Sequence, residues 1–293
     1  MLPALISNSL SRPSCPQHGQ LVRHGKFFRK DDGQTIQRYR CPRCKKTFSD
    51  ASGHPFFRQH KRTVNFRILF YLSSCMSQRR IAKALGLDRK TVIRKFLFFG
   101  PLAEEALAYF NSLFPKATDV QFDEMESFEH TKCKPLSIPM AVENKTRRIL
   151  SFGVASMPAK GLLAAVARKK YGFRRDDRKE ARLDVLKNLA NLVSKEARFF
   201  SDKNPSYPSE IRSIFPKSSH ETTKGARGAV TGQGELKKTR WDLLFSFNHT
   251  AAMLRENINR LKRRTWCTTK KAERLRMHIA IYALYHNLSL GLL

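Results

Sequence analysis

The spacing of apolar residues changes along the chain, and each change predicts a different kind of element. Residues 1–50 are rich in Gly, Pro, Cys and polar residues, with short strand-like runs such as 37–40. Between residues 60 and 115, apolar residues recur every three or four positions, which predicts helices. From about Asp119 the pattern becomes that of β-strands, so we expect a sheet to begin there.

The region after Asp119 alternates between strand-like and helical spacing. Three strands are predicted, at 120–123, 137–142 and 148–155, with Asn144-Lys145 as a hairpin turn between the last two. Residues 197–201 have the composition of a short buried strand, and 217–240 that of a polar, basic loop or insertion. Helical spacing is found at 176–198, 241–262 and 270–290. Together these segments predict an α+β multidomain protein.

Two short motifs near the start predict a zinc site. Cys15-Pro16-Gln17-His18 and Cys41-Pro42-Arg43-Cys44 each place two metal-binding side chains three positions apart, and His18 and Cys41 are separated by 23 positions. Zinc requires four such ligands in a tetrahedron, and a tight turn presents two of them. We therefore expect Cys15, His18, Cys41 and Cys44 to hold a structural Zn²⁺ in a zinc ribbon. His24 or His54 could replace His18, and turns without a metal are the alternative.

The segment Ser77–Phe96 has the features of a helix-turn-helix. Ile81 and Ala82 form the inner side of a first helix, Gly86 permits a tight turn, and Asp88 is placed to cap the next helix. The second helix is expected to expose a basic surface that enters the major groove of DNA. That surface comprises Arg89, Lys90, Arg94 and Lys95. A helical hairpin that only links two domains is the alternative.

Charge is the most unusual bulk property. The chain has 56 Lys and Arg against 24 Asp and Glu, a net charge of +32, and these cations are distributed along its whole length. Such an excess favours a polyanionic partner, above all nucleic acid, over a ribosome-associated role or an anionic membrane. No apolar run of 18 residues occurs, and Met1–Ile6 lacks the basic region of a signal peptide, so we expect a cytoplasmic, nucleoid-associated protein.

The six cysteines do not form a disulfide framework. Three belong to the zinc motifs, and Cys75, Cys133 and Cys267 are scattered, which predicts buried small apolar side chains in a reducing compartment.

Two aspartates are candidates for catalytic metal binding. Asp123 follows a strand-like run, and Asp202 follows the short apolar strand that contains Phe199 and Phe200. Carboxylates held at strand ends can bind two divalent ions that activate an attacking oxygen and stabilise a leaving one. A turn or helix-capping role is the alternative for each.

A third candidate lies in the helical segment 241–261. Asn248 and Arg255 are seven positions apart, nearly two helical turns, and therefore share one face. The amide oxygen of Asn248 is a possible Mg²⁺ ligand, and Arg255 is a possible phosphate contact. An ordinary polar position on a helix is the alternative for Asn248.

These motifs together resemble the DDE-type transposases of bacterial insertion sequences, in the group that begins with a zinc ribbon. The resemblance covers roughly residues 15–290, and its most specific parts are Asp123-Glu124-Met125 and the basic run Arg260-Leu261-Lys262-Arg263-Arg264-Thr265 with Thr268-Thr269-Lys270-Lys271. It implies an RNase H-like α/β catalytic domain that binds Mg²⁺ or Mn²⁺ and cuts and rejoins DNA at inverted terminal repeats. The implied domains are a zinc ribbon (1–55), a helix-turn-helix (56–115) and the catalytic domain (116–293).

The resemblance also assigns roles to single residues. Asp123 corresponds to the first acid and Asp202 to the second, while Asn248 stands where many members have Glu and related groups have Asn. Arg255 stands where such families often carry Lys. Basic residues of 168–182 and 260–271 are expected to track the DNA backbone, among them Arg260, Arg263, Arg264, Lys270 and Lys271. Double-stranded DNA and a homodimer or larger assembly are the implied partners, with no membrane.

The amide at Asn248 leaves several alternatives open. Less negative charge then balances the metal ions, and Glu124, Glu126, Asp242 or Glu256 are possible replacements. An inactive derivative, a DNA-binding regulator and an RNA-associated zinc-ribbon protein are the competing interpretations. His220, after a possible strand at 213–219, could approach the metals but is expected in a surface loop. Trp241 and Trp266 are expected in the core.

Overall fold

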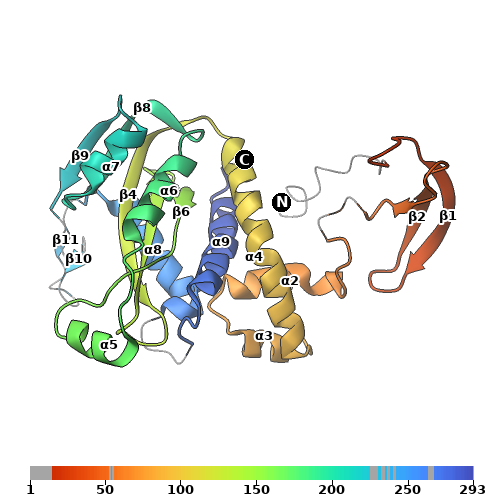
Figure 1. Cartoon of the computed structure of the whole chain (residues 1–293), viewed down its shortest axis with the longest axis horizontal. Helices are drawn as coiled ribbons and strands as arrows, with labels where there is room; N and C mark the ends of the chain where they lie inside the picture. Colours follow the sequence, from red (N-terminus) through yellow and green to blue (C-terminus); the bar gives the residue numbers. More distant parts are fainter. Residues whose placement is uncertain are drawn as a thin grey trace. The chain divides into compact units, whose positions relative to one another are not determined.

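The computed structural model describes residues 15–52, 54, 56–224, 230, 231, 235, 238, 239, 242–262 and 267–292. The chain forms two compact units, one ending at Phe70 and the other beginning at Tyr71, and the division falls within helix α2 (Asn65–Leu72). Figure 1 shows the course of the chain through both units. Among the described helices, none combines the length and apolar character needed to cross a membrane.

The first unit is a small antiparallel sheet stabilised by a turn and by ion pairs. Its elements are β1 (Val22–Arg29), β2 (Gln34–Arg40), β3 (Thr47–Ser49) and the 3-10 helix η1 (Arg62–Val64). The turn between β1 and β2 is closed by Gly33, whose φ of 70° lies in the region that glycine adopts most easily. The Asp31 carboxylate accepts a hydrogen bond from the Arg62 backbone NH at 3.0 Å and so ties this turn to η1. Little apolar surface is buried in the three strands, where Ile36 is the main buried apolar side chain.

The second unit contains a mixed sheet with the strand order β6-β5-β4-β8-β9. Its strands are β4 (Ala117–Phe128), β5 (Pro135–Glu143), β6 (Ile149–Phe152), β7 (Ala155–Ser156), β8 (Val193–Asp202) and β9 (Ser219–Thr223), and β10 (Val230–Thr231) and β11 (Lys238–Thr239) form a separate pair. β4, β5 and β6 are antiparallel neighbours, while β4, β8 and β9 are parallel. β7 pairs with β5 outside this order.

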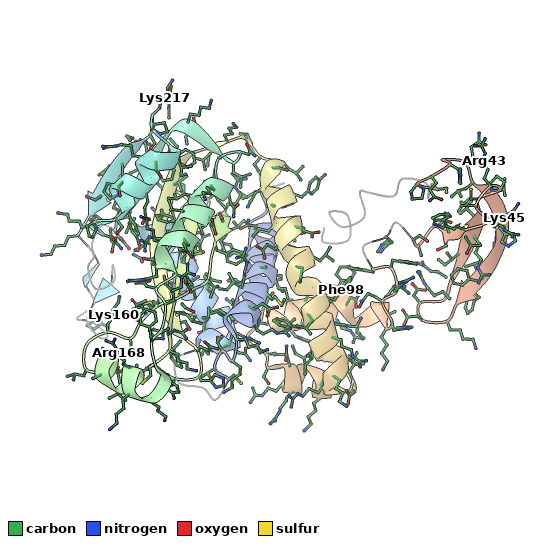
Figure 2. The ribbon with its side chains drawn as sticks, in the orientation of Figure 1. Arg43, Lys45, Phe98, Lys160, Arg168 and Lys217 are labelled. Carbon is green, nitrogen blue, oxygen red and sulfur yellow. The ribbon has the colours of Figure 1, made fainter. Side chains whose placement is uncertain are left out.

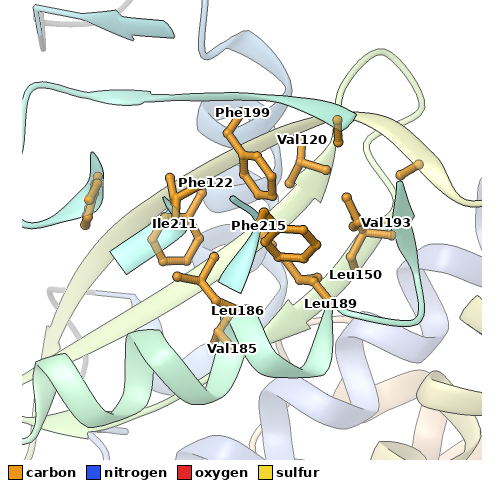
Figure 3. Close-up of a cluster of buried hydrophobic side chains, with 14 residues drawn as sticks. Val120, Phe122, Leu150, Val185, Leu186, Leu189, Val193, Phe199, Ile211 and Phe215 are labelled. Atoms are coloured by element: carbon orange, nitrogen blue, oxygen red, sulfur yellow. The ribbon is translucent and has the colours of Figure 1, made fainter. Parts of the chain in front are cut away.

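Helices pack on both faces of this sheet. The described helices of the unit are α3 (Gln78–Ala84), α4 (Arg89–Ser112), α5 (Leu163–Tyr171), α6 (Arg178–Asn188), α7 (Tyr207–Ile214), α8 (Phe245–Asn257), the 3-10 helix η3 (Asn259–Leu261) and α9 (Ala272–Ser289). Side chains of β4 alternate between the faces. Val120 and Phe122 enter a core formed with α6 and α7, which Figure 3 shows, and Gln121 on the other face bonds to α8.

Helix α4 is fixed to the sheet and to α9 by close packing and buried amides. A Cβ on Gly100 would lie 2.5 Å from Cγ of Met277, so glycine allows α4 to approach α9. Asn111 of α4 donates to the Ile149 carbonyl at 3.0 Å, and Asn287 of α9 accepts from the Ile149 NH at 2.9 Å. The predicted segment 56–115 is therefore divided, because α3 and α4 belong to the second unit.

The mixed α/β architecture is confirmed, but several predicted element boundaries differ. The region 176–198 is a helix only to Asn188, and β8 begins at Val193 rather than at residue 197. Residues 213–219 are not a strand, since α7 extends to Ile214 and β9 begins at Ser219. Helix α5 has no counterpart in the prediction, because it has almost no buried side to produce a helical pattern.

Candidate functional site

The two Cys/His motifs bring four metal-binding side chains together. Cys15, His18, Cys41 and Cys44 have ligand atoms within 4.8 Å of one another. Sγ of Cys15 lies 3.6 Å from Sγ of Cys44 and 3.7 Å from Nδ1 of His18, and Sγ of Cys41 lies 3.6 Å from the same Nδ1. Sulfur ligands about 2.3 Å from a tetrahedral zinc ion are about 3.8 Å apart. The side chains are therefore already spaced as ligands of one ion.

Matching backbone turns produce this spacing. The NH of Gly19 donates to the Cys15 carbonyl at 2.8 Å, and the NH of Lys45 donates to the Cys41 carbonyl at 3.0 Å. Gly19 and Lys45 both have positive φ, so each turn reverses immediately after its second ligand. The backbone NH of Cys44, and then that of Arg43, donate to the Cys41 thiol and lower its pKa to about 6. A lowered pKa favours the thiolate, which is the form that binds metal. His24 and His54 are not part of the cluster.

Asp123 and Asp202 are neighbours on adjacent parallel strands. β4 and β8 pair with Val120 opposite Phe199 and Gln121 opposite Phe200. The same offset of 79 residues places Asp202, the last residue of β8, beside Asp123 on the same face of the sheet. β4 continues to Phe128 with β5 alone as its partner, so both carboxylates lie where the β8 side of the sheet ends.

The carboxylate of Asp123 is in an unfavourable environment for its charge. Burial, and then the negative charge of Asp202, raise the pKa of Asp123 to about 7 from an ordinary value of 3.8. Hydrogen bonds from the Glu124 NH at 2.7 Å and the Tyr207 hydroxyl at 3.2 Å act in the opposite direction. Two acids that repel each other in a partly buried position are suited to a cation, which would neutralise both.

Helix α8 begins over the sheet face that carries Asp123. The Gln121 side chain, two residues before Asp123, donates to the Leu243 carbonyl at 2.7 Å and accepts from the Phe247 NH at 2.6 Å. These bonds fix the first turn of α8, and Asn248 follows directly. Asn248 is exposed, and its amide Nδ2 donates to Asp242 at 2.9 Å. Arg255, also on α8, is partly buried.

The acids considered as replacements for Asn248 differ in their surroundings. Glu124 faces away from Asp123 along the strand, bonded to Arg182 at 3.3 Å and to Ser137 at 2.6 Å. Glu126 pairs with Lys160, and Glu256 pairs with Lys262. Only Asp242, of these four, is hydrogen-bonded to Asn248. Within the described residues, the zinc motifs form the one group of three or more His, Cys, Asp or Glu close enough for an ion.

A buried polar network that the sequence did not reveal supports Asp123. The Arg182 guanidinium forms two 2.7 Å hydrogen bonds with Glu210 and also contacts Glu124. The Tyr207 hydroxyl joins this network to the site, because it donates to Asp123 and lies 3.3 Å from Glu124. These residues belong to β4, α6 and α7, so no local motif contains them.

The segment Ser77–Phe96 has a turn and helix caps at the expected positions. Asp88 accepts a hydrogen bond from the Lys90 NH at 2.7 Å and begins α4, and Gly86 has a φ of 61°. Arg89, Lys90 and Arg94 are exposed. The predicted outward position of Lys95 is wrong, because its side chain is 3% exposed. Lys95 lies on the buried side of α4, together with Val92, Phe96 and Phe99.

The basic residues of the later segment differ in exposure. Lys270 and Lys271 are exposed, and Lys270 is near His130, whose NH donates to the Thr269 carbonyl. Arg260 is partly buried, and its guanidinium lies 5.4 Å from the centre of the Phe96 ring. Burial lowers the pKa of Arg260 to about 10. Arg260 is therefore not a simple surface residue of the kind expected to contact DNA. Arg263 and Arg264, like Trp241 and Trp266, lie outside the described residues.

The remaining predictions concern His220 and the three scattered cysteines. The predicted loop position of His220 is wrong, since it is a half-buried residue of β9. Its Nε2 lies 2.8 Å from the Ser201 hydroxyl, and the strand register places it on the face opposite Asp202. Cys133 is buried as predicted, but Cys75 is only partly buried and Cys267 is exposed.

No protein-family model matches the chain, and no curated protein matches it in sequence.

Proposed function

We propose that the protein is a DDE-type DNA transposase that binds the ends of its element and catalyses metal-dependent strand cleavage and strand transfer. The observation that carries the proposal is the position of Asp123 beside Asp202, which follows when the register of Gln121 opposite Phe200 is continued by two residues to the end of β8. Residues 79 positions apart are brought side by side with the same charge, in partial burial. Such an arrangement costs stability unless a cation is bound, which supports a metal-binding role over a purely structural one.

The sheet topology supports an RNase H-like catalytic domain. Three antiparallel strands precede two parallel strands, and the first acid lies on the central strand, β4. The second acid lies on the adjacent strand, β8, and α8 covers the same face. This arrangement is the one expected when three well-separated parts of the chain form a single nuclease site.

The donor atoms suit Mg²⁺ or Mn²⁺. Asp123 and Asp202 offer carboxylate oxygens, and Asn248 offers an amide oxygen from the helix over their face. When bound, two divalent ions activate an attacking oxygen and stabilise the leaving oxygen of an in-line displacement. The protein positions these groups: β4 and β8 set the spacing of the acids, and Gln121 sets the start of α8. Arg255 supplies positive charge for phosphate on the same helix.

The remaining surfaces fit DNA recognition. The zinc ribbon formed by Cys15, His18, Cys41 and Cys44 is a closed four-ligand site, so its zinc would be structural rather than catalytic. The start of α4 exposes Arg89, Lys90 and Arg94 beside a capped turn, as a major-groove helix requires. A net charge of +32 provides affinity for the phosphate backbone.

Cleavage of DNA taken from both sides of the protein's own gene tests the proposal. Purified protein with labelled duplex and Mg²⁺ or Mn²⁺ is expected to cut at a fixed boundary, and Asp123→Asn and Asp202→Asn are each expected to lose at least 1,000-fold in rate, about 4 kcal/mol of transition-state stabilisation. Asp184→Asn is the matched control, because Asp184 is an exposed acid on α6 and should be replaceable without effect. Full cleavage by Asp123→Asn would overturn the mechanism.

A regulator or inactive derivative is the second candidate. Asn248 donates its Nδ2 to Asp242, which leaves only its neutral Oδ1 to face a metal, and the missing charge of a third carboxylate favours this candidate. This candidate predicts sequence-specific duplex binding that is unaffected by Mg²⁺, with no cleavage. Asn248→Asp then decides whether a carboxylate restores activity. Asp242→Asn decides whether Asp242 is itself a ligand.

A further inference from the structure

Helix α5 is almost entirely exposed, although it carries large apolar side chains. Only Ala167 among its nine residues is buried. Leu162 is 97% exposed and Phe173, just after the helix, is 84% exposed, while Leu163, Val166 and Tyr171 are also exposed. Apolar groups gathered on one short helix in this way indicate a binding surface. We call residues 158–173 the α5 lobe.

The α5 lobe is attached beside the proposed active site. Arg174 donates to the carbonyls of Met157 at 3.2 Å and Pro135 at 3.4 Å, which fixes the end of the lobe to the start of β5. At its other end Lys160 pairs with Glu126 at 3.0 Å. Glu126 follows Asp123 by three residues on β4, about 10 Å along the strand, and the side chains of the two residues lie on opposite faces of the sheet. A DNA strand held at Asp123 would therefore reach the lobe by passing the end of β4.

The charge of the lobe selects an anionic partner. Residues 158–173 contain four cations, Lys160, Arg168, Lys169 and Lys170, and no Asp or Glu. Figure 2 labels Lys160 and Arg168 in this part of the chain. A second copy of a chain with net charge +32 would be repelled by such a surface. An anionic partner that also presents flat apolar groups is required, and unpaired nucleotides have both properties.

A cavity under α5 matches the same chemistry. Its volume is about 380 Å³, the size of a small ligand site, and it lies between α5 and the turn before β5. Apolar walls come from Cys133, Ala164, Ala167 and Phe173. Lys134, Arg168 and Arg174 supply cations, and Asp176 supplies an acid that is itself paired with Arg178. The ammonium of Lys134 lies 4.6 Å from the Tyr171 ring centre and so holds a positive charge at the wall.

We propose that the α5 lobe binds unpaired bases of the DNA strand next to the cleavage site, with Phe173 and Leu162 contacting base faces and Arg168 and Lys169 contacting phosphates. The proposal rests on the proposed function for the source of the DNA, but the binding itself requires no cleavage. Aromatic and apolar side chains on a basic surface are the usual means of holding single strands. Bases are accessible to such a surface only where the duplex is opened, as it is around a cut.

Binding of a fluorescent oligothymidine to the full-length protein without divalent metal tests this inference. Phe173→Ala and Leu162→Ser are each expected to weaken single-strand binding by about 5-fold or more, as for lost base stacking, with little effect on a fully paired duplex. Arg168→Gln is expected to lower the salt dependence of binding by about 0.7 in log–log slope. Leu113→Ser, an equally simple change at an exposed leucine on the end of α4, is the matched control.

The outcomes separate this inference from the proposed function. Loss of single-strand binding in Phe173→Ala supports the α5 lobe even if the wild-type protein never cuts DNA. Unchanged binding in Phe173→Ala and Leu162→Ser overturns the inference, even if cleavage depends fully on Asp123. Two further results would also overturn it. The first is a monomer–dimer equilibrium that Phe173→Ala alters while DNA binding stays unchanged. The second is that Phe173→Ala weakens binding to anionic lipid vesicles as much as binding to oligothymidine.

Discussion

The carboxylates of Asp123 and Asp202 are neighbours on β4 and β8, although 79 residues separate them in the chain. The strand register alone creates this relationship, since continuing the pairing of Gln121 with Phe200 by two residues reaches both acids. Burial, and then the negative charge of Asp202, raise the pKa of Asp123 to about 7. The metal-free protein is therefore expected to carry an electrostatic cost at the proposed site, and this cost can be measured.

The first prediction concerns stability and pH. Because the folded-state pKa of Asp123 is above its ordinary 3.8, folded protein retains a proton that unfolded protein releases between about pH 4 and pH 7. The free energy of unfolding of metal-free protein should therefore fall as pH rises through that window. Asp123→Asn should be more stable than wild type by about 1–3 kcal/mol at pH 8 and similar to it at pH 4. Denaturant unfolding at both pH values measures this, and equal stability at pH 8 would contradict it.

Tyr207 is predicted to position Asp123. Tyr207→Phe keeps the ring that packs 5.1 Å from Phe122 but removes the hydroxyl bonded to Asp123. We expect about a tenfold lower rate of cleavage with unchanged DNA affinity, because one hydrogen bond to a charged group is lost. A shift in the pH profile of cleavage would distinguish positioning from general destabilisation. Tyr109→Phe, at an exposed tyrosine, serves as the control.

Removal of zinc should affect the first unit selectively. Its three strands bury few apolar side chains, so the metal site is expected to supply most of their stability. Chelation or Cys44→Ser should abolish amide hydrogen-exchange protection in residues 22–49 and leave that of 117–202 unchanged. Measured zinc content should fall from about one ion per chain. Full protection of β1 and β2 without metal would show that the cluster is not structural.

Arg94 and Lys95 are adjacent but should respond differently to substitution. Arg94 is exposed near the start of α4, so Arg94→Gln should lower the salt dependence of duplex binding by about one in log–log slope. Lys95 is 3% exposed, so Lys95→Met should leave that slope unchanged. Titration of duplex DNA at several salt concentrations compares the two. An effect of Lys95→Met on the slope equal to that of Arg94→Gln would contradict the packing of α4.

Gly100 is predicted to be intolerant of even a methyl group. An added Cβ would approach Cβ of Met277 to 2.6 Å, and that atom is close to the α9 backbone and cannot move freely. Gly100→Ala should therefore lower the free energy of unfolding by about 1–3 kcal/mol, despite the higher helix propensity of alanine. Gly100→Ala combined with Met277→Gly, which also removes that Cβ, should recover more of the loss than Gly100→Ala combined with Met277→Ala. Thermal unfolding of the single and double variants provides the measurement.

The sequence predicted those parts of the structure that residues close together in the chain determine. The spacing of Cys15, His18, Cys41 and Cys44 indicated the metal cluster, and Asp88 begins α4 as its capping pattern suggested. Alternation around Phe122 located β4. These features arise from turns, caps and strand periodicity, which a few adjacent residues determine.

Other features depend on contacts between distant segments and were missed. β8 starts earlier than predicted because two consecutive exposed polar residues near its start, Lys195 and Glu196, hide the strand pattern. Lys95 is on the covered side of α4, which only the packing of the second unit identifies. Tyr207 and Arg182 reach Asp123 and Glu124 from separate helices, and no spacing in the sequence relates them.

The packing of α4 against α9 has a consequence for protein synthesis. α9 begins 160 residues after α4 ends, and Asn111, Gly100 and Met277 show how closely the two depend on each other. While the ribosome is still making the intervening residues, the helix proposed to read DNA lacks the partner that covers its apolar side. A chain released early would expose that side to chaperones and proteases. If α4 binds DNA as proposed, recognition is thereby tied to completion of the chain, and incomplete fragments would not compete with the whole protein for its binding sites.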